Sequence, residues 1–214
     1  FGRQMSDPEI GCALSHILVY KEIIKRNLPG ALVLEDDTVW SDAATALLRE
    51  LEPGGTDFLQ LDYGWADIWR LIPGQRSGVA GIKFKRLAKN AGLANSYLIS
   101  KSTAECLVSR SLPIRFPADW PCDLRGHRPM ITVPRVCHQG NKGASYLESG
   151  RRYLEKESRD QNASIMQRKS KPKKKQSGRN PPPEMPYILY RLLITRISPA
   201  SIRDGIQAKG AADE

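Results

Sequence analysis

The sequence of 214 residues lacks the features that mark several specialised classes of protein. No apolar stretch approaches the roughly 18 uninterrupted residues of a membrane-spanning helix, and no signal-peptide pattern stands at the start. The four cysteines form no C-x-x-C pair, so their spacing does not indicate a zinc site, and they are too few for a disulfide framework. Cys12 and Cys106 fall in apolar helical patterns, where a buried free thiol is expected. A hydrophobic content of 40% then fits a soluble globular protein, for which we expect a cytoplasmic location.

Positive charge is concentrated in one part of the chain. Lys and Arg outnumber Asp and Glu by 18 to 16 over residues 1–150, by 10 to 3 over residues 151–175, and by 5 to 4 over residues 176–214. The formal net charge of +10 is therefore mostly a property of the tail, and the body of the protein is nearly neutral.

The tail also has a composition that opposes a packed core. Arg168 to Lys175 is a run of Lys and Arg broken by Ser and Pro, and three prolines follow at 181–183. We predict a division of the chain into a globular domain, a flexible basic Pro-rich linker and a short amphipathic segment that is helical up to Pro199, at residues 1–160, 161–184 and 185–214.

Helical and strand patterns alternate along the body. Ser6 and Glu9 form a capping-box signature, and apolar residues then recur at a helical period until Asn27 and Pro29-Gly30. The continuous apolar run 31–34 predicts a strand buried on both faces of a parallel sheet. Similar reasoning predicts further helices over 41–51 and 101–109, and strands over 58–61, 96–99 and 131–133. This alternation indicates an α/β fold with a mainly parallel central sheet flanked by helices.

Three consecutive acids, Glu35, Asp36 and Asp37, follow the apolar run directly. Open α/β sheets bind ligands at the carboxyl ends of their strands, and a hard divalent cation is held there by carboxylates together with substrate phosphates. Alternation along an extended backbone would place Glu35 and Asp37 on one side and Asp36 on the other. The acids alone leave an alternative open, in which the cluster is solvated and one Asp merely caps a turn.

Two segments together resemble the signature of glycosyltransferase family 25, which includes bacterial lipopolysaccharide and lipooligosaccharide galactosyltransferases and collagen galactosyltransferases. They are the segment 9–16 (Glu-Ile-Gly-Cys-Ala-Leu-Ser-His) and the segment 32–37 (Leu-Val-Leu-Glu-Asp-Asp), separated by a helix. Three later pieces are also similar to the family, at 96–101, 117–119 and 134–139. The family begins with a strand and a helix that help to hold the nucleotide, and we expect this chain to start after them.

The resemblance implies a GT-A-like fold for residues 1–160 as a catalytic domain, and metal-assisted inverting transfer of a sugar, galactose by family preference. The donor would be a UDP-sugar, the cofactor Mn²⁺ or Mg²⁺, and the acceptor a glycolipid or another saccharide. Glu35 and Asp37 are the expected metal ligands, with Asp36 available to a sugar hydroxyl. Asp119 is the first candidate for the catalytic base and Asp62 its rival. Ser15, His16 and Gln139 are candidates for contacts around the donor, and we expect His16 to be a structural residue and not a metal ligand.

The basic tail suggests peripheral contact with an anionic membrane surface, because each basic residue near such a surface contributes about 1 kcal/mol. A solvated tail without a partner is the plain alternative. Nucleic-acid binding through Arg168–Lys175 would be non-specific, and no specific nucleic acid is expected because the body carries no recognisable nucleic-acid module. A second alternative is a magnesium-dependent phosphohydrolase that uses the acids, but it would ordinarily need an aspartyl nucleophile in a stricter motif, which is not evident. A third is a catalytically inactive relative that serves as a binding partner.

Overall fold

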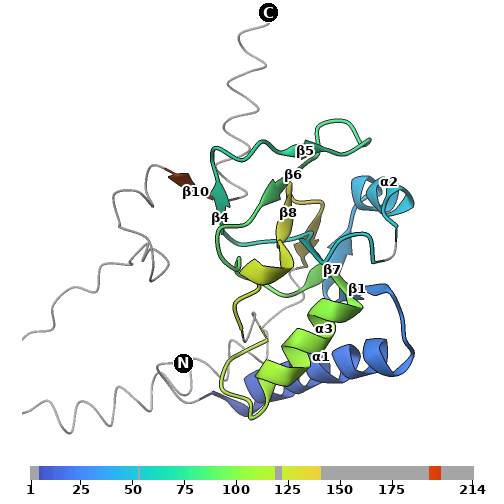
Figure 1. The fold of residues 1–214 in the computed structure, drawn as a ribbon, viewed down its shortest axis with the longest axis vertical. Coiled ribbons are helices and arrows are strands. Elements are labelled where there is room, and N and C mark those ends of the chain that lie inside the picture. The colour runs from blue at the N-terminus through green and yellow to red at the C-terminus, as the bar shows by residue number, and fades with distance from the viewer. Residues whose placement is uncertain (1–4, 53, 119–121, 141–192, 199–214) are drawn as a thin grey trace, which may run out of the picture.

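The computed structural model describes residues 5–52, 54–118, 122–140 and 193–198 (Figure 1). The predicted basic linker 161–184 and most of the segment 185–214 lie outside these residues, as does Asp119. The predicted division of the chain into three parts therefore stays a prediction.

The first helix, α1 (Asp7–Lys25), begins where the sequence predicts. The backbone N–H of Ser6 donates to the Glu9 carboxylate at 3.0 Å, so the capping box forms. After Lys25 the chain leaves the helix through Asn27, whose φ of 52° lies in the left-handed region that Asn tolerates better than most residues. The buried positions of α1 include Ala13, Ile17 and Tyr20, and they form the stripe that faces the core.

Six strands form the main sheet, and most neighbours in it run antiparallel. The sheet order is β1 (Gly30–Leu34), β7 (Ser96–Ser100), β3 (Phe58–Gln60), β8 (Met130–Val133), β6 (Lys83–Arg86) and β5 (Gln75–Arg76). Only the β3–β8 pair is parallel among the described strands, so the prediction of a mainly parallel sheet is wrong and the fold is mixed α/β. The apolar run at 31–34 gave no information on strand direction, and β1 is not buried on both faces as the run predicted. β1 in fact lies at one edge of this sheet, and Leu34 is 45% exposed.

Two further pairs of strands lie beside the main sheet. β2 (Thr38–Trp40) pairs with β9 (Cys137–Gln139), and β4 (Ala66–Trp69) pairs with β10 (Ile194–Ile197), both antiparallel. The predicted C-terminal helix is therefore wrong over Ile194–Ile197. Three of these four residues are β-branched, which favours a strand, and Arg196 forms a two-pronged ion pair with the buried Asp67, at 2.7 and 3.0 Å.

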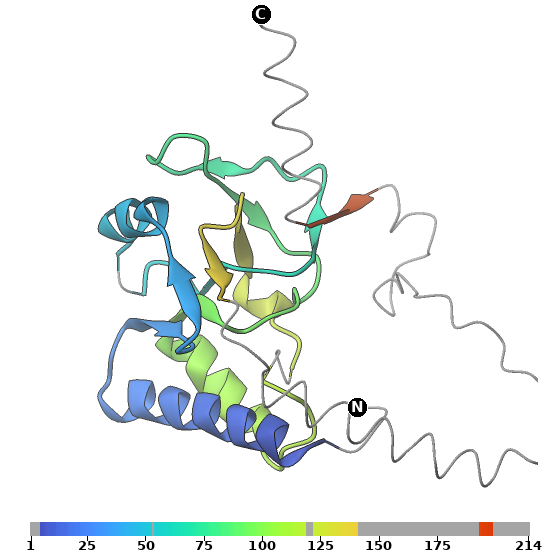
Figure 2. The same ribbon diagram turned by 180° about the vertical axis from the view of Figure 1, so that it is seen from behind.

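Helices cover both faces of the main sheet (Figures 1 and 2). α1 packs with α3 (Lys101–Ser111) on one face, where Tyr20, Phe58 and Tyr97 belong to one core cluster. α2 (Asp42–Glu50) covers the other face, where Leu47 joins a second cluster with Leu59. The neighbours Phe58 and Leu59 enter opposite clusters because successive strand residues point to opposite faces. A short 3₁₀ turn, Arg125–His127, precedes β8. None of the helices in the described part of the chain has the length and apolarity to cross a membrane.

Candidate functional site

The three acids form a tight turn between β1 and β2, which we call the acid loop (Glu35–Asp37). The backbone N–H of Glu35 donates to the carbonyl oxygen of Asn95 at 2.8 Å, and the Thr38 hydroxyl donates to the same oxygen at 2.9 Å. The backbone N–H of Thr38 closes the turn on the Glu35 carbonyl at 3.1 Å. Asn95 directly precedes β7, so the acid loop is fixed to the end of the neighbouring strand.

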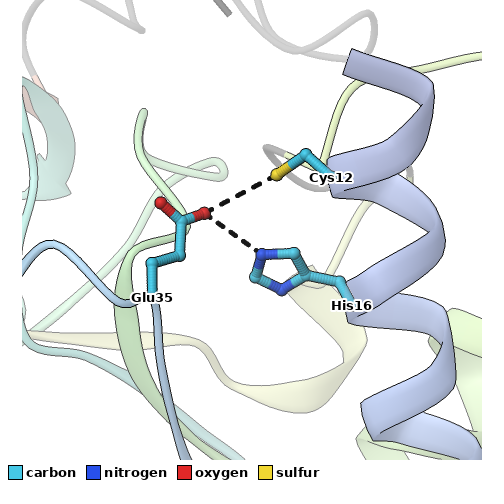
Figure 3. A group of neighbouring side chains, drawn as sticks. All are labelled: Cys12, His16 and Glu35. Carbon is cyan, nitrogen blue, oxygen red and sulfur yellow. Dashed lines mark hydrogen bonds and ion pairs between the residues drawn. The ribbon is translucent and has the colours of Figure 1, made fainter. Parts of the chain in front are cut away.

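Glu35 turns toward α1 and does not point into bulk solvent (Figure 3). Its Oε1 lies 3.2 Å from Nε2 of His16 and 3.8 Å from Sγ of Cys12. Residues 12 and 16 are one helical turn apart, so both side chains project from the same face of α1. The other carboxylate oxygen of Glu35 points away from the helix in Figure 3.

On the side of the ring away from Glu35, His16 contacts a series of buried polar groups. Its Nδ1 lies 2.8 Å from the Tyr97 hydroxyl, and that hydroxyl lies 2.8 Å from the hydroxyl of Tyr20. Burial raises the pKa of Tyr97 and that of Tyr20 well above the ordinary value for tyrosine, so both remain neutral hydroxyls at physiological pH. These contacts hold the imidazole of His16 in one orientation, and the histidine in turn orients Glu35.

Asp37 is held from the opposite side. The Gln139 side-chain amide donates to its Oδ2 at 2.8 Å, and the Gly140 N–H donates to its backbone carbonyl at 2.8 Å. These contacts arise because β2 pairs with β9, which places Thr38 opposite Gln139. Oδ1 of Asp37 is buried and has no hydrogen-bond partner among the described residues. One carboxylate oxygen is therefore anchored, and the other can accept a ligand.

Two of the predicted donor contacts, Asp36 and Ser15, are exposed to solvent, and their roles stay predictions. The side chain of Asp36, between Glu35 and Asp37 in the acid loop, is exposed to solvent. Ser15 is also exposed, and its hydroxyl donates to the carbonyl of Gly11 within α1 at 3.0 Å. Residue 15 lies on the solvent side of the helix, whereas the side chains of Cys12 and His16 face the acid loop.

Asp62 follows β3 and is completely buried. Its Oδ1 accepts from the Arg135 guanidinium at 2.9 Å and from the Tyr63 N–H at 2.7 Å, whereas Oδ2 has no hydrogen-bond partner in the described part of the chain. Asp62 therefore resembles Asp37 in being anchored through one oxygen only. Arg135 places an opposite charge beside this buried carboxyl group.

The segment that precedes Asp119 lies beside α1. Pro117 and Ala118 line a small apolar pocket together with His16 and Tyr20. Asp119 itself lies outside the described residues, and its role as base stays a prediction.

Several residues of the site were not found by sequence reasoning. Cys12 is half-buried and not a fully buried core thiol, and it points at Glu35. The i, i+4 spacing of Cys12 and His16 is the signal that could have found it. Tyr97, Asn95 and Arg135 were missed because their contacts depend on strand order, which the local pattern did not give.

Comparisons with known proteins agree with the sequence resemblance. The family model described as "Glycosyltransferase family 25 (LPS biosynthesis protein)" matches residues 1–121. The chain is 27% identical over 156 residues to the rat protein "Probable inactive glycosyltransferase 25 family member 3" (Rattus norvegicus). It is 27% identical over 159 residues to the mouse "Inactive glycosyltransferase 25 family member 3" (Mus musculus), and a bovine (Bos taurus) relative of similar name is 26% identical. Each match covers 62% of this chain, which spans only about a quarter of the length of these relatives, 26–27%.

Proposed function

The chain belongs to glycosyltransferase family 25, and from this premise we propose that it transfers a sugar from a UDP-sugar donor to a saccharide acceptor. Galactose is the sugar that the family resemblance favours, and lipopolysaccharide or another surface glycan is the acceptor class. The transfer would invert the anomeric carbon and use Mn²⁺ or Mg²⁺. The observation that carries this proposal is the half-anchored carboxylate of Asp37 in the acid loop.

The residues of the acid loop fit a divalent cation. A buried carboxylate oxygen without a partner is costly unless a cation or a donor group meets it, and Oδ1 of Asp37 is such an atom. Gln139 fixes the other oxygen, which is how residues behind a metal ligand usually orient it. Asp37 and Glu35 would hold the metal, and Asp36 is exposed where a sugar hydroxyl could meet it. A bound metal would stabilise the negative charge that develops on the departing diphosphate.

The protein's own side chains would do the remaining work. His16 keeps the carboxylate of Glu35 turned to one orientation, and Gln139 does the same for Asp37, so neither has to be ordered when the donor arrives. A carboxylate would accept the proton of the attacking hydroxyl as the new glycosidic bond forms. Asp119 is the first candidate for that base. Asp62 remains the second, although its buried ion pair with Arg135 gives it a structural role as well.

The experiment compares the full chain with its Asp37→Asn variant across a panel of UDP-sugars. We expect Mn²⁺- or Mg²⁺-dependent release of UDP from one donor, and thermal stabilisation by donor only when metal is present. Asp37→Asn should lower donor turnover by at least tenfold, because its amide is a poorer ligand for a hard cation. Asp42→Asn, at an exposed position in the first turn of α2, is the matched control. Full activity of Asp37→Asn with intact metal dependence would refute the assignment.

A second function is favoured by the names of the relatives, all of which include the word "inactive". In that case the acid loop would bind metal and donor without transfer, and the chain would act as a binding protein. The same panel separates the two functions. Stabilisation by a UDP-sugar with metal, but without release of UDP in the presence of any acceptor, would favour the binding protein.

A further inference from the structure

Three side chains with metal-binding atoms converge at the junction of α1 and the acid loop. They are Cys12, His16 and Glu35, and one ligand atom of each lies within 4.8 Å of the other two. Figure 3 shows the thiol and the imidazole side by side on the helix, both directed at one carboxylate oxygen. We propose that these three residues form a zinc site. It is a second metal site beside the Mn²⁺ or Mg²⁺ expected at Asp37, and Glu35 would be shared by both, since its other carboxylate oxygen points away from the helix.

The distances between the ligand atoms fit a tetrahedral zinc ion. Zinc bonds of about 2.0–2.3 Å at tetrahedral angles put a nitrogen and an oxygen ligand about 3.4 Å apart, and a sulfur and an oxygen ligand about 3.6 Å apart. The corresponding distances are 3.2 Å from His16 Nε2 to Glu35 Oε1 and 3.8 Å from Cys12 Sγ to the same oxygen. For these two pairs of atoms, seating an ion requires shifts of a few tenths of an ångström, and the sulfur and the nitrogen lie within 4.8 Å of each other.

The histidine is already oriented for this role. Tyr97 engages Nδ1 at 2.8 Å, and Tyr20 engages the Tyr97 hydroxyl in turn. If Nδ1 carries the proton and donates to Tyr97, then Nε2 is a lone-pair donor that faces Cys12 and Glu35. Histidine ligands of zinc are held in this way, with the second ring nitrogen hydrogen-bonded to a neighbour that fixes the tautomer. The stacked rings of His16 and Tyr97, 5.9 Å apart, restrict the imidazole further.

The combination of ligands selects the metal. A thiolate together with an imidazole and a carboxylate is a zinc set, whereas Mg²⁺, Mn²⁺ and Ca²⁺ prefer oxygen ligands. On binding, the Cys12 thiol gives its proton to solvent and the sulfur bonds to the metal as thiolate. Three protein ligands leave the fourth position open. Glu35 has a side chain 25% exposed and Cys12 is half-buried, so water or an anionic oxygen could reach that position.

The test uses Co²⁺ as a spectroscopic substitute for zinc in the metal-stripped 214-residue chain. We expect one equivalent of Co²⁺ to produce a thiolate-to-cobalt charge-transfer band, which Zn²⁺ then abolishes by displacement. Cys12→Ser should remove the band and weaken Zn²⁺ binding at least tenfold. Cys106→Ser, which changes a half-buried cysteine on α3, should retain both. Asp37→Asn should also keep the band, so a failure here is distinguishable from a failure of the proposed transferase function.

A second measurement needs no variant. Zn²⁺ should protect Cys12 from alkylation in the wild-type chain while leaving the reaction of Cys106 unchanged, as read from the modified peptides by mass spectrometry. The proposal is overturned by the absence of a thiolate band at stoichiometric Co²⁺, by an unchanged band in Cys12→Ser, or by equal alkylation of Cys12 with and without Zn²⁺.

Discussion

The carboxylate of Glu35 is positioned by a series of side chains that contact one another in turn. His16 links this carboxylate to the Tyr97 hydroxyl, and Tyr97 is linked to the Tyr20 hydroxyl. Each of these three polar contacts is 3.2 Å or shorter. Tyr97 and Tyr20 are almost fully buried, so these hydrogen bonds cannot be exchanged for water. Buried polar chains of this kind stabilise a single arrangement when every member has a partner, and they become costly when one member is removed.

Tyr97→Phe should therefore destabilise the protein by about 1–3 kcal/mol, because the change leaves the Tyr20 hydroxyl and His16 Nδ1 with an unsatisfied bond. The measurement is the free energy of unfolding from urea titration monitored by circular dichroism. Tyr63→Phe is the matched control: Tyr63 is equally buried, but its hydroxyl has no well-aligned hydrogen-bond partner among the described residues. Equal losses in the two variants would contradict this account.

At this scale the sequence predicted some contacts and not others. Residue type and the family resemblance made candidates of two acids, one histidine and one glutamine. The structure brings them together in two pairs, Glu35 with His16 and Asp37 with Gln139. Cys12 was not a candidate, because a cysteine in an apolar helical pattern is usually core. Its partner is 23 positions away in sequence, and only the packing of α1 against the end of β1 brings the two together.

Among the elements, β1 depends on a close approach of two backbones. A Cβ atom on Gly30 would lie 2.6 Å from the backbone N of Gly54 and 3.0 Å from the carbonyl oxygen of Ile99. Neither neighbour is a flexible side chain, so the strand or the turn would have to shift. Gly11, in the exposed part of α1, has no neighbour within 4 Å of the same position in the described structure.

The two glycines predict opposite effects of the same substitution. Gly30→Ala should lower the free energy of unfolding by about 1–3 kcal/mol through overpacking. Gly11→Ala should raise it by up to about 1 kcal/mol, because alanine has the higher helix propensity. Both changes are measured from the midpoint of urea unfolding, provided that the dependence of the unfolding free energy on urea concentration is the same in the variant and the wild type. A neutral or stabilising Gly30→Ala would show that β1 does not pack as described.

Element types followed from local patterns, but element directions did not. α1 and its capping box, α2, α3 and strands β1, β3, β7 and β8 arose close to their predicted positions, because capping and hydrophobic periodicity act locally. The antiparallel insertion of β7 between β1 and β3 depends on contacts between residues far apart in sequence. For the same reason β10 could not be predicted: Ile194–Ile197 becomes a strand only because β4 and Asp67 are available to it.

On the scale of the whole chain, charge separates the tail from the body. Residues 151–175 hold 10 Lys and Arg against 3 Asp and Glu. We predict that the full chain sediments with vesicles rich in anionic lipid, and that about 0.5 M salt releases it by screening. Replacing Lys173, Lys174 and Lys175 with Gln should weaken this binding several-fold. Replacing Lys21, Lys25 and Arg26 of the body with Gln is the control. Equal binding to neutral vesicles would contradict electrostatic attachment.

We propose that the acid loop holds a divalent cation and, through it, a nucleotide diphosphate. The most direct test of this claim is electron paramagnetic resonance of Mn²⁺ titrated into the full chain with and without UDP. We predict that UDP raises the fraction of bound Mn²⁺, and that Asp37→Asn abolishes this rise while Asp42→Asn preserves it. If the wild-type chain binds Mn²⁺ no better with UDP, or if Asp37→Asn responds as the wild type does, the claim is wrong.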